Sequence, residues 1–312
     1  MFDLVGKRRW WFLVSALLIV PGLLVMIYST IAEGSPLRLG IDFTSGSLLE
    51  LRFEQALAPG DVRAVALGSG LDEAEVKSVG DEFTLSIRTK PMEVEAKEVL
   101  RAALEAAFGP TTELRFESVG PTVGRETTRA AVLAIIAASV AILFFIAIAF
   151  RKVPNAFRYG VCAIAKMFHD VLVMLGLASI LGLLAGWEVD SLFLTAMVTV
   201  VGFSVEDVIV VFDRIRENIR RRRGEPYETV VNRSLLETLH RSLATQLNSM
   251  FVMVALIFFG GATLRQFITV MLFGMLTGTY SSLFFAVPLL VTWEKGDLGR
   301  LFRRPRGQQA AA

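Results

Sequence analysis

Ionisable side chains interrupt several long apolar segments of this 312-residue chain. Lys166 and Asp170 lie four residues apart in one segment, and Glu206 and Asp207 are adjacent in another. Arg241 stands where a third segment begins. A charge near the middle of a bilayer costs at least about 2.5 kcal/mol, so such groups normally face a protein interior or water and mark a transport path. These residues therefore suggest transfer of a proton or small cation across a membrane.

The depth of Asp170 follows from its position along the segment. Counted from Phe157, it lies about 20 Å inside, close to the midplane. Lys166 is one helical turn away, so the two side chains are expected to form an i,i+4 ion pair. Such a pair is consistent with a structural role and equally with a role in an ion path.

Glu206 and Asp207 lie about 9 Å inside Asp213, where we place the cytoplasmic boundary. The two carboxylates point about 100° apart, so one partner cannot neutralise both, and we expect a proton or counter-cation on at least one. The Glu206 side chain alternatively extends to the cytoplasm, so Asp207 is the stronger candidate for a functional role in ion transfer. The Arg241 side chain is long enough to reach inward toward Asp207, although it alternatively stays at the lipid headgroups.

The composition limits the other kinds of chemistry. A hydrophobic share of 54% and a mean hydropathy of +0.56, combined with 20% charged residues, indicate a membrane protein with one soluble insert. One cysteine and two histidines exclude a disulfide framework and a His/Cys metal cluster. No phosphate-binding loop is recognisable, so we predict a non-enzyme without a cofactor and without a nucleic-acid partner.

A bilayer core needs roughly 20 apolar residues per helix. Six segments reach this length: Trp10–Ile31, Ala130–Phe150, Phe157–Leu184, Ser191–Phe212, Leu243–Phe259 and Phe267–Trp293. The first is longer than the apolar region of a signal peptide, and we interpret it as an uncleaved anchor. Basic residues gather in Arg151–Arg158, in Asp213–Arg241 and in the tail, so these parts and both termini are predicted to be cytoplasmic.

The predicted organisation has four parts. Residues 1–31 form the cytoplasmic N-terminus and first span, and 32–129 an extracytoplasmic domain. Residues 130–293 form spans two to six with the basic cytoplasmic loop 213–241, and 294–312 a basic cytoplasmic tail. Pro226 is predicted to begin an amphipathic helix that lies against membrane lipid and leads into the fifth span.

The segment 32–129 alternates strand-like and helical patterns. Strands are predicted at Arg38–Phe53, Glu75–Val79, Phe83–Thr89 and Thr112–Val119. A short helix is expected to open at Pro59, and a longer one covers Met92–Phe108. The resulting order is β-α-β-β-α-β, the ferredoxin-like arrangement.

Several motifs resemble those of the SecF family of protein-export membrane proteins. The run from Gly40 to Gly46 reads G-I-D-F-T-S-G, and the fourth span carries V-G-F-S-V-E-D followed by D-R-I-R-E-N. His169-Asp170 in the third span also matches. The motif positions are Gly40, Asp42, Phe43, Gly46, His169, Gly202, Ser204, Asp213 and Arg214.

This resemblance implies an α-helical polytopic membrane protein with six transmembrane helices, half of a resistance-nodulation-division (RND) type fold, plus a small α+β ferredoxin-like extracytoplasmic domain. It implies SecD as the completing partner, the Sec translocation channel and preproteins as further partners, and the bacterial inner membrane as the location. The coupling ion would be H⁺, with Na⁺ as the alternative. The positions of Asp207 and Arg241 correspond to the family's ion-coupling pair, with Asp170 and Glu206 as further candidates.

The chain departs from the family pattern at several positions. Ser45 replaces a usual glycine, which weakens the argument that this loop needs unrestricted backbone angles. Glu206 replaces a neutral residue, and Gln246 and Asn248 replace small or hydroxylated ones. A second carboxylate beside Asp207 leaves the choice between H⁺ and Na⁺ open.

Two other functions are consistent with the same residues. One is a stand-alone RND-type small-molecule efflux carrier, which would normally have twice as many spans, or a half-transporter. The other is a receptor or scaffold whose intramembrane charges are structural, so that neutral substitutions of Asp207 and Arg241 would leave its activity intact.

Overall fold

The computed structural model of the chain describes residues 3–71, 73–79, 81–150, 156–222, 224–260 and 262–296. It has two compact units. The helical unit comprises Met1–Leu24, Ala137–Gly176 and the chain from Thr195 onward, and the sheet unit comprises Val25–Ile136 and Leu177–Leu194. Residues 151–155 of the predicted basic loop, Arg223 and the tail beyond 296 lie outside the described residues.

Six helices in the described part of the chain are long and apolar enough to cross a membrane, as predicted, and the chain is a multi-pass membrane protein. The first five are α1 (Arg8–Glu33), α5 (Pro121–Phe150), α6 (Ala156–Ala185), α7 (Ser191–Arg221) and α8 (Tyr227–Phe259). The sixth consists of α9 (Ala262–Ser281), a π-helical turn η1 (Ser282–Ala286) and α10 (Val287–Glu294).

Helices α7 and α8 extend well beyond a bilayer core. Their 31 and 33 residues correspond to about 46 and 50 Å, against a hydrocarbon thickness of about 30 Å. The helix predicted to begin at Pro226 and to lead into the fifth span is present as the first part of α8. The prediction that this segment lies against membrane lipid is wrong. Its apolar residues Val230, Val231 and Leu235 are buried within the protein.

Glycines allow close helix packing in the helical unit. A Cβ atom added to Gly22 of α1 would lie 2.5 Å from the Cα atom of Gly176 on α6. Small residues at such crossings let membrane helices approach and gain van der Waals contact. The first and third spans therefore meet backbone to backbone.

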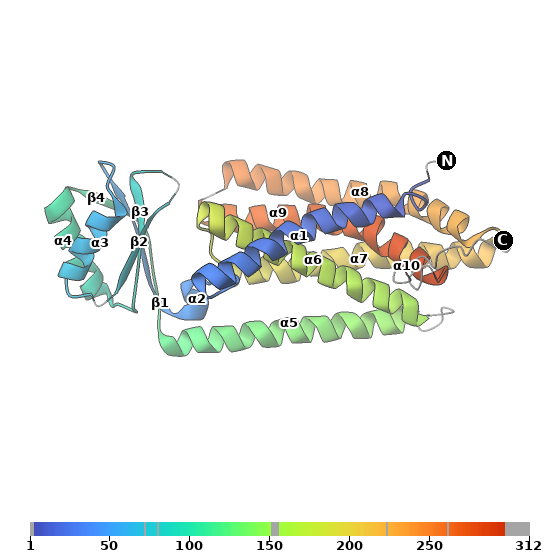
Figure 1. Cartoon of the computed structure of the whole chain (residues 1–312), viewed down its shortest axis with the longest axis horizontal. Coiled ribbons are helices and arrows are strands. Elements are labelled where there is room, and N and C mark those ends of the chain that lie inside the picture. The colour runs from blue at the N-terminus through green and yellow to red at the C-terminus, as the bar shows by residue number, and fades with distance from the viewer. Residues whose placement is uncertain are drawn as a thin grey trace, which may run out of the picture. The chain divides into compact units, whose positions relative to one another are not determined.

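The sheet unit has the predicted order of strands and helices. Its elements are β1 (Gly46–Phe53), α3 (Pro59–Gly68), β2 (Ala74–Ser78), β3 (Thr84–Thr89), α4 (Val94–Phe108) and β4 (Thr111–Val119). The strands lie in the order β2-β3-β1-β4, with every neighbouring pair antiparallel. Both helices cover one face of the sheet (Figure 1), where Leu49, Leu51, Val62, Leu100 and Leu104 are buried in its core.

The strand predicted from Arg38 begins later because a short helix, α2 (Ile41–Thr44), precedes it. Ser45 ends this helix with φ 61° and ψ 165°, a region that essentially only glycine occupies without strain. Gly46 has φ 130°, and a Cβ atom there would lie 2.7 Å from the Thr89 carbonyl oxygen. The loop therefore requires glycine-like backbone angles, contrary to the inference drawn from Ser45.

Candidate ion-translocation site

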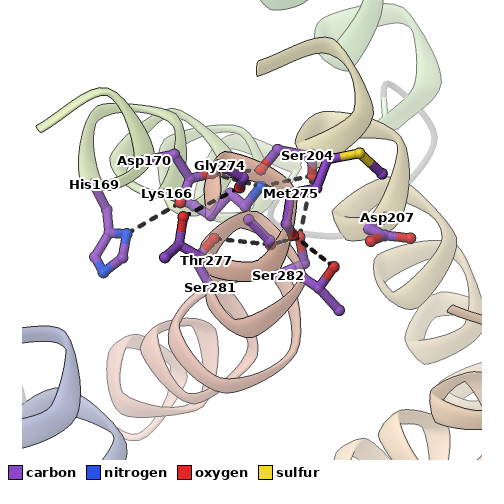
Figure 2. Close-up of polar contacts among 12 residues, drawn as sticks. Lys166, His169, Asp170, Ser204, Asp207, Gly274, Met275, Thr277, Ser281 and Ser282 are labelled. Atoms are coloured by element: carbon purple, nitrogen blue, oxygen red, sulfur yellow. Dashed lines mark hydrogen bonds and ion pairs between the residues drawn. The ribbon is translucent and has the colours of Figure 1, made fainter. Parts of the chain in front are cut away.

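A buried ion pair connects the third span to the fourth. Lys166 Nζ lies 2.8 Å from Asp170 Oδ2, and their side chains are 0% and 1% exposed. The predicted i,i+4 pair is therefore present. Lys166 also donates a hydrogen bond of 2.6 Å to the Ser204 carbonyl oxygen of α7, and the Ser204 hydroxyl donates to Asp170 Oδ2 (Figure 2).

His169 is the second neighbour of this carboxylate. Its Nδ1 atom is 3.1 Å from Asp170 Oδ1, and its ring packs on Phe285 with a centroid separation of 4.7 Å. The Nε2 atom is buried without a hydrogen-bond partner among the described residues. Both carboxylate oxygens of Asp170 are thus engaged, one by the histidine and the other by a lysine and a serine.

The sixth span contributes Ser282, which sequence reasoning did not identify. Its hydroxyl lies 3.1 Å from the Ser204 carbonyl oxygen and 2.8 Å from that of Gly278. Ser282 begins the π-helical turn, and such turns inside α-helices occur frequently at functional sites. The signal in the sequence was the run of hydroxyl residues in an apolar span, namely Thr277, Thr279, Ser281 and Ser282.

Asp207 lies apart from this cluster on α7 (Figure 2) and is also buried. Gln246 Nε2 of α8 donates a hydrogen bond of 2.9 Å to Asp207 Oδ2. No ion pair joins Asp207 to Arg241 among the residues that the structure describes. The ion-coupling role of that pair stays a prediction.

Arg241 is exposed in the isolated chain and lines a pocket of about 540 Å³. The other charged residues of the pocket are Asp213, Arg214, Glu217 and Glu237. Arg214 donates hydrogen bonds of 2.6 Å to Glu237 on α8 and to Glu217 on its own helix. The motif residue Arg214 therefore links α7 to α8 by a partly exposed ion pair.

Glu206 points away from Asp207, as helix geometry predicts. Its side chain is exposed and lines an apolar pocket of about 430 Å³ with Ala141, Phe145 and Gly202. A carboxylate on an apolar surface of a membrane span needs a partner that the described residues do not supply.

The Gly40–Gly46 motif holds the start of the fourth span. The backbone N–H of Gly40 donates a 2.8 Å hydrogen bond to the carbonyl oxygen of Val189. The carboxylate of Asp42 accepts a 2.9 Å hydrogen bond from the backbone N–H of Ser191. Ser191 is the first residue of α7, whose N–H groups lack helical partners. Asp42 thus caps α7, while Phe43 lies in the α2 turn.

Comparison with known proteins agrees with this arrangement. Residues 99–296 match the family model of the protein export membrane protein SecD/SecF, C-terminal, and residues 34–57 match the SecD/SecF GG motif. The protein translocase subunit SecF of Thermobaculum terrenum is 45% identical over 100% of both chains. The chain belongs to the SecF family. A second SecF, from Anaerolinea thermophila, is 45% identical over 97% of this chain and 98% of its own.

Solved structures extend the SecF comparison to the fold. The crystal structure of SecDF, a translocon-associated membrane protein from Thermus thermophilus, superposes with a TM-score of 0.78 at 33% identity over 94% of this chain. This SecF-family chain spans 39% of that SecDF chain. SecDF in its super-membrane-facing form gives a TM-score of 0.64 at 31% identity, over 96% of this chain and 40% of that one.

Proposed function

We propose that this SecF-family protein is an accessory subunit of the Sec protein translocase. Together with SecD, it uses an ion gradient to promote the translocation and release of preproteins. The observation that carries the proposal is the set of buried ionisable groups inside the spans of a chain similar over its whole length to translocase subunits. Such groups are costly in a membrane and are typical of ion paths. An ion gradient would supply the energy, so the chain needs no hydrolytic chemistry of its own.

SecD is the proposed partner because this chain corresponds to part of the SecDF chain and exposes a charged apolar surface. It spans 39% of the SecDF chain, and Glu206 lies on an exposed apolar surface. A second six-helix half, as in an RND-type fold, would cover that surface. The strand order β2-β3-β1-β4 and the β-α-β-β-α-β sequence support a ferredoxin-like fold for the sheet unit.

The proposed location is the bacterial inner membrane, with both termini in the cytoplasm. Arginines concentrate at the turn of the α7–α8 hairpin, where Arg220, Arg221 and Arg222 follow one another, and basic loops stay on the cytoplasmic side. The sheet unit is then outside the cytoplasm, where emerging preproteins would meet it.

The proposed coupling ion is the proton, and Asp207 is its proposed carrier. Asp207 is buried and accepts a hydrogen bond from the neutral side chain of Gln246. Asp170, in contrast, is already neutralised by Lys166. Na⁺ is the alternative ion, and a test of each gradient separates the two.

Preprotein translocation into membrane vesicles tests the proposal. The vesicles contain this protein, its SecD partner and the Sec channel, and the proton and sodium gradients are collapsed separately. We expect export to depend on both subunits and to fall when the proton gradient is removed. Export that is independent of this chain would overturn the proposal. Transport of small molecules by the chain alone would overturn it in favour of an efflux carrier.

A further inference from the structure

The side chain of Gln246 is satisfied at only one end. Its Nε2 atom donates to Asp207 Oδ2 at 2.9 Å, whereas its Oε1 atom is buried without a hydrogen-bond partner among the described residues. The residue is 6% exposed. A polar atom that is buried without a hydrogen-bond partner destabilises the folded state, and such atoms are few in native proteins. The unpaired oxygen is therefore a specific feature of this site.

The charged groups near Asp207 do not bond to it directly. The nearest cation on α6 is Lys166, whose ammonium group is held by Asp170 and by the Ser204 carbonyl oxygen. Glu206 is adjacent in sequence and faces another pocket. From α8, the group that bonds to the carboxyl is the neutral amide of Gln246.

A neutral amide differs from a cation as a partner for a titrating carboxyl group. An arginine or lysine has only donors, so it can bond to the carboxylate but has no acceptor for the proton of the acid. A glutamine has N–H donors at one end and a carbonyl acceptor at the other. Its terminal torsion is broad, so the two ends exchange by rotation of the amide.

We propose that Gln246 is a positioning residue that holds Asp207 in both protonation states. In the ionised state, Nε2–H donates to the carboxylate, as the structure shows. When a proton binds to Asp207, the amide rotates about its terminal torsion, and Oε1 accepts a hydrogen bond from the O–H of the acid. The proton comes from one side of the membrane and leaves to the other, so no bond other than this O–H forms or breaks. The inference rests on the proposed function and names a residue that would support its proton step.

Infrared difference spectroscopy on acidification tests this, using the full chain in lipid vesicles. Asp207→Asn identifies the C=O band of the protonated Asp207 carboxyl group by its loss. In Gln246→Leu, that band should move to the higher frequency of an acid without a hydrogen-bond partner. Asn248→Leu is the matched control, because Asn248 is an exposed amide two residues further along the same helix, and its band should not move.

A second variant keeps the test valid if Gln246→Leu does not fold. In Gln246→Glu, two carboxyl groups would share one proton, so the protonated band should persist to a pH higher by about one unit or more. A band unchanged in frequency and pH dependence in these variants would overturn the inference. Dependence of the band on Na⁺ at constant pH would do the same.

Translocation measured in parallel separates this inference from the proposed function. If Asp207→Asn stops gradient-driven export while the Gln246 variants leave the band unchanged, the proposed function stands and the role of Gln246 is wrong. If Asp207→Asn exports normally, proton coupling through Asp207 is wrong, whatever the band shows.

Discussion

The ammonium group of Lys166 on α6 donates a 2.6 Å hydrogen bond to the backbone carbonyl oxygen of Ser204 on α7. The same group forms the ion pair with Asp170 one turn along its own helix. Ser204 returns a hydrogen bond from its hydroxyl to that carboxylate. One lysine, one aspartate and one serine thus tie two spans together while the pair stays neutral overall.

Breaking the Lys166–Asp170 pair from one side should be more damaging than removing both charges. Lys166→Met and Asp170→Asn each leave a buried charge without its partner, which typically costs about 3–5 kcal/mol. The double variant leaves no stranded charge, so its loss of melting temperature in detergent should be clearly smaller than the sum of the single losses.

Arg158→Met is the matched control for that experiment. Arg158 pairs with Glu294, but both side chains are about one third exposed, and such pairs contribute about 0–1 kcal/mol. If the losses of melting temperature in Lys166→Met and Asp170→Asn are additive and no larger than the loss in Arg158→Met, the two residues do not form a buried ion pair.

Ser45→Gly should stabilise the protein. Ser45 has φ 61° and ψ 165°, a conformation that costs a non-glycine residue about 1–3 kcal/mol. Part of the gain is lost to the greater freedom of glycine in the unfolded chain, so we expect a net gain of about 1 kcal/mol. Thermal unfolding checks this, with Ser45→Ala, which keeps the Cβ atom, as the control. An equal gain from alanine would show that the backbone angle is not the cause.

Gly22→Ala should weaken the packing of the first span. Its new Cβ atom would lie 2.5 Å from Gly176 Cα, a distance that forces the two helices apart. Gly202→Ala provides the comparison, because nothing lies within 4 Å of a Cβ atom there. We expect a lower melting temperature for the Gly22 variant and little change for the Gly202 variant. The reverse order would contradict the close crossing.

Asp190 should make stability fall as pH rises. Burial raises the pKa of its carboxyl group, and the nearby Asp42 adds to this, although the backbone N–H of Phe193 opposes it. The folded state therefore binds the proton more tightly than the unfolded chain, so the stabilisation present below about pH 4 is lost as pH rises through the raised pKa. Asp190→Asn should flatten this dependence in melting curves from pH 4 to 7.

Two variants of Asp190 distinguish the effect of its charge from the effect of its hydrogen bond to the start of α7. Its Oδ1 atom accepts a 2.7 Å hydrogen bond from the N–H of Phe193 near the start of α7. Asparagine keeps such an acceptor, whereas Asp190→Ala removes it and should cost about 1 kcal/mol at every pH. An unchanged pH slope in Asp190→Asn would show that another group titrates.

Long periodic elements were predictable from the sequence, because apolar length and strand alternation depend on local patterns. The six spans and the β-α-β-β-α-β order follow from such patterns. The burial of the first part of α8 within the protein was not predictable, since its amphipathic face fits lipid and protein equally well. The positive φ of Ser45 was missed because the residue type argued against it.

The depth of each charged residue in its span was predictable from the sequence, but the contacts between residues on different helices were not. The Lys166–Asp170 pair lies within one helix, so its spacing alone fixes it. The partner of Asp207 depends on how α8 is rotated against α7, which no spacing determines. The reach of Arg241 allowed this contact and the family resemblance favoured it, whereas the structure places Gln246 at the carboxylate.

Gradient-driven export by the Asp207→Asn variant is the direct test of proton coupling through Asp207. Translocation of a preprotein is followed in vesicles that contain the variant, its SecD partner and the Sec channel, with and without an imposed proton gradient. Asparagine fixes the neutral state, so the gradient-dependent part of export should be lost while folding and partner binding persist. Export at the normal gradient-dependent rate would contradict the proposal that Asp207 carries the proton and would show that proton coupling lies at another residue.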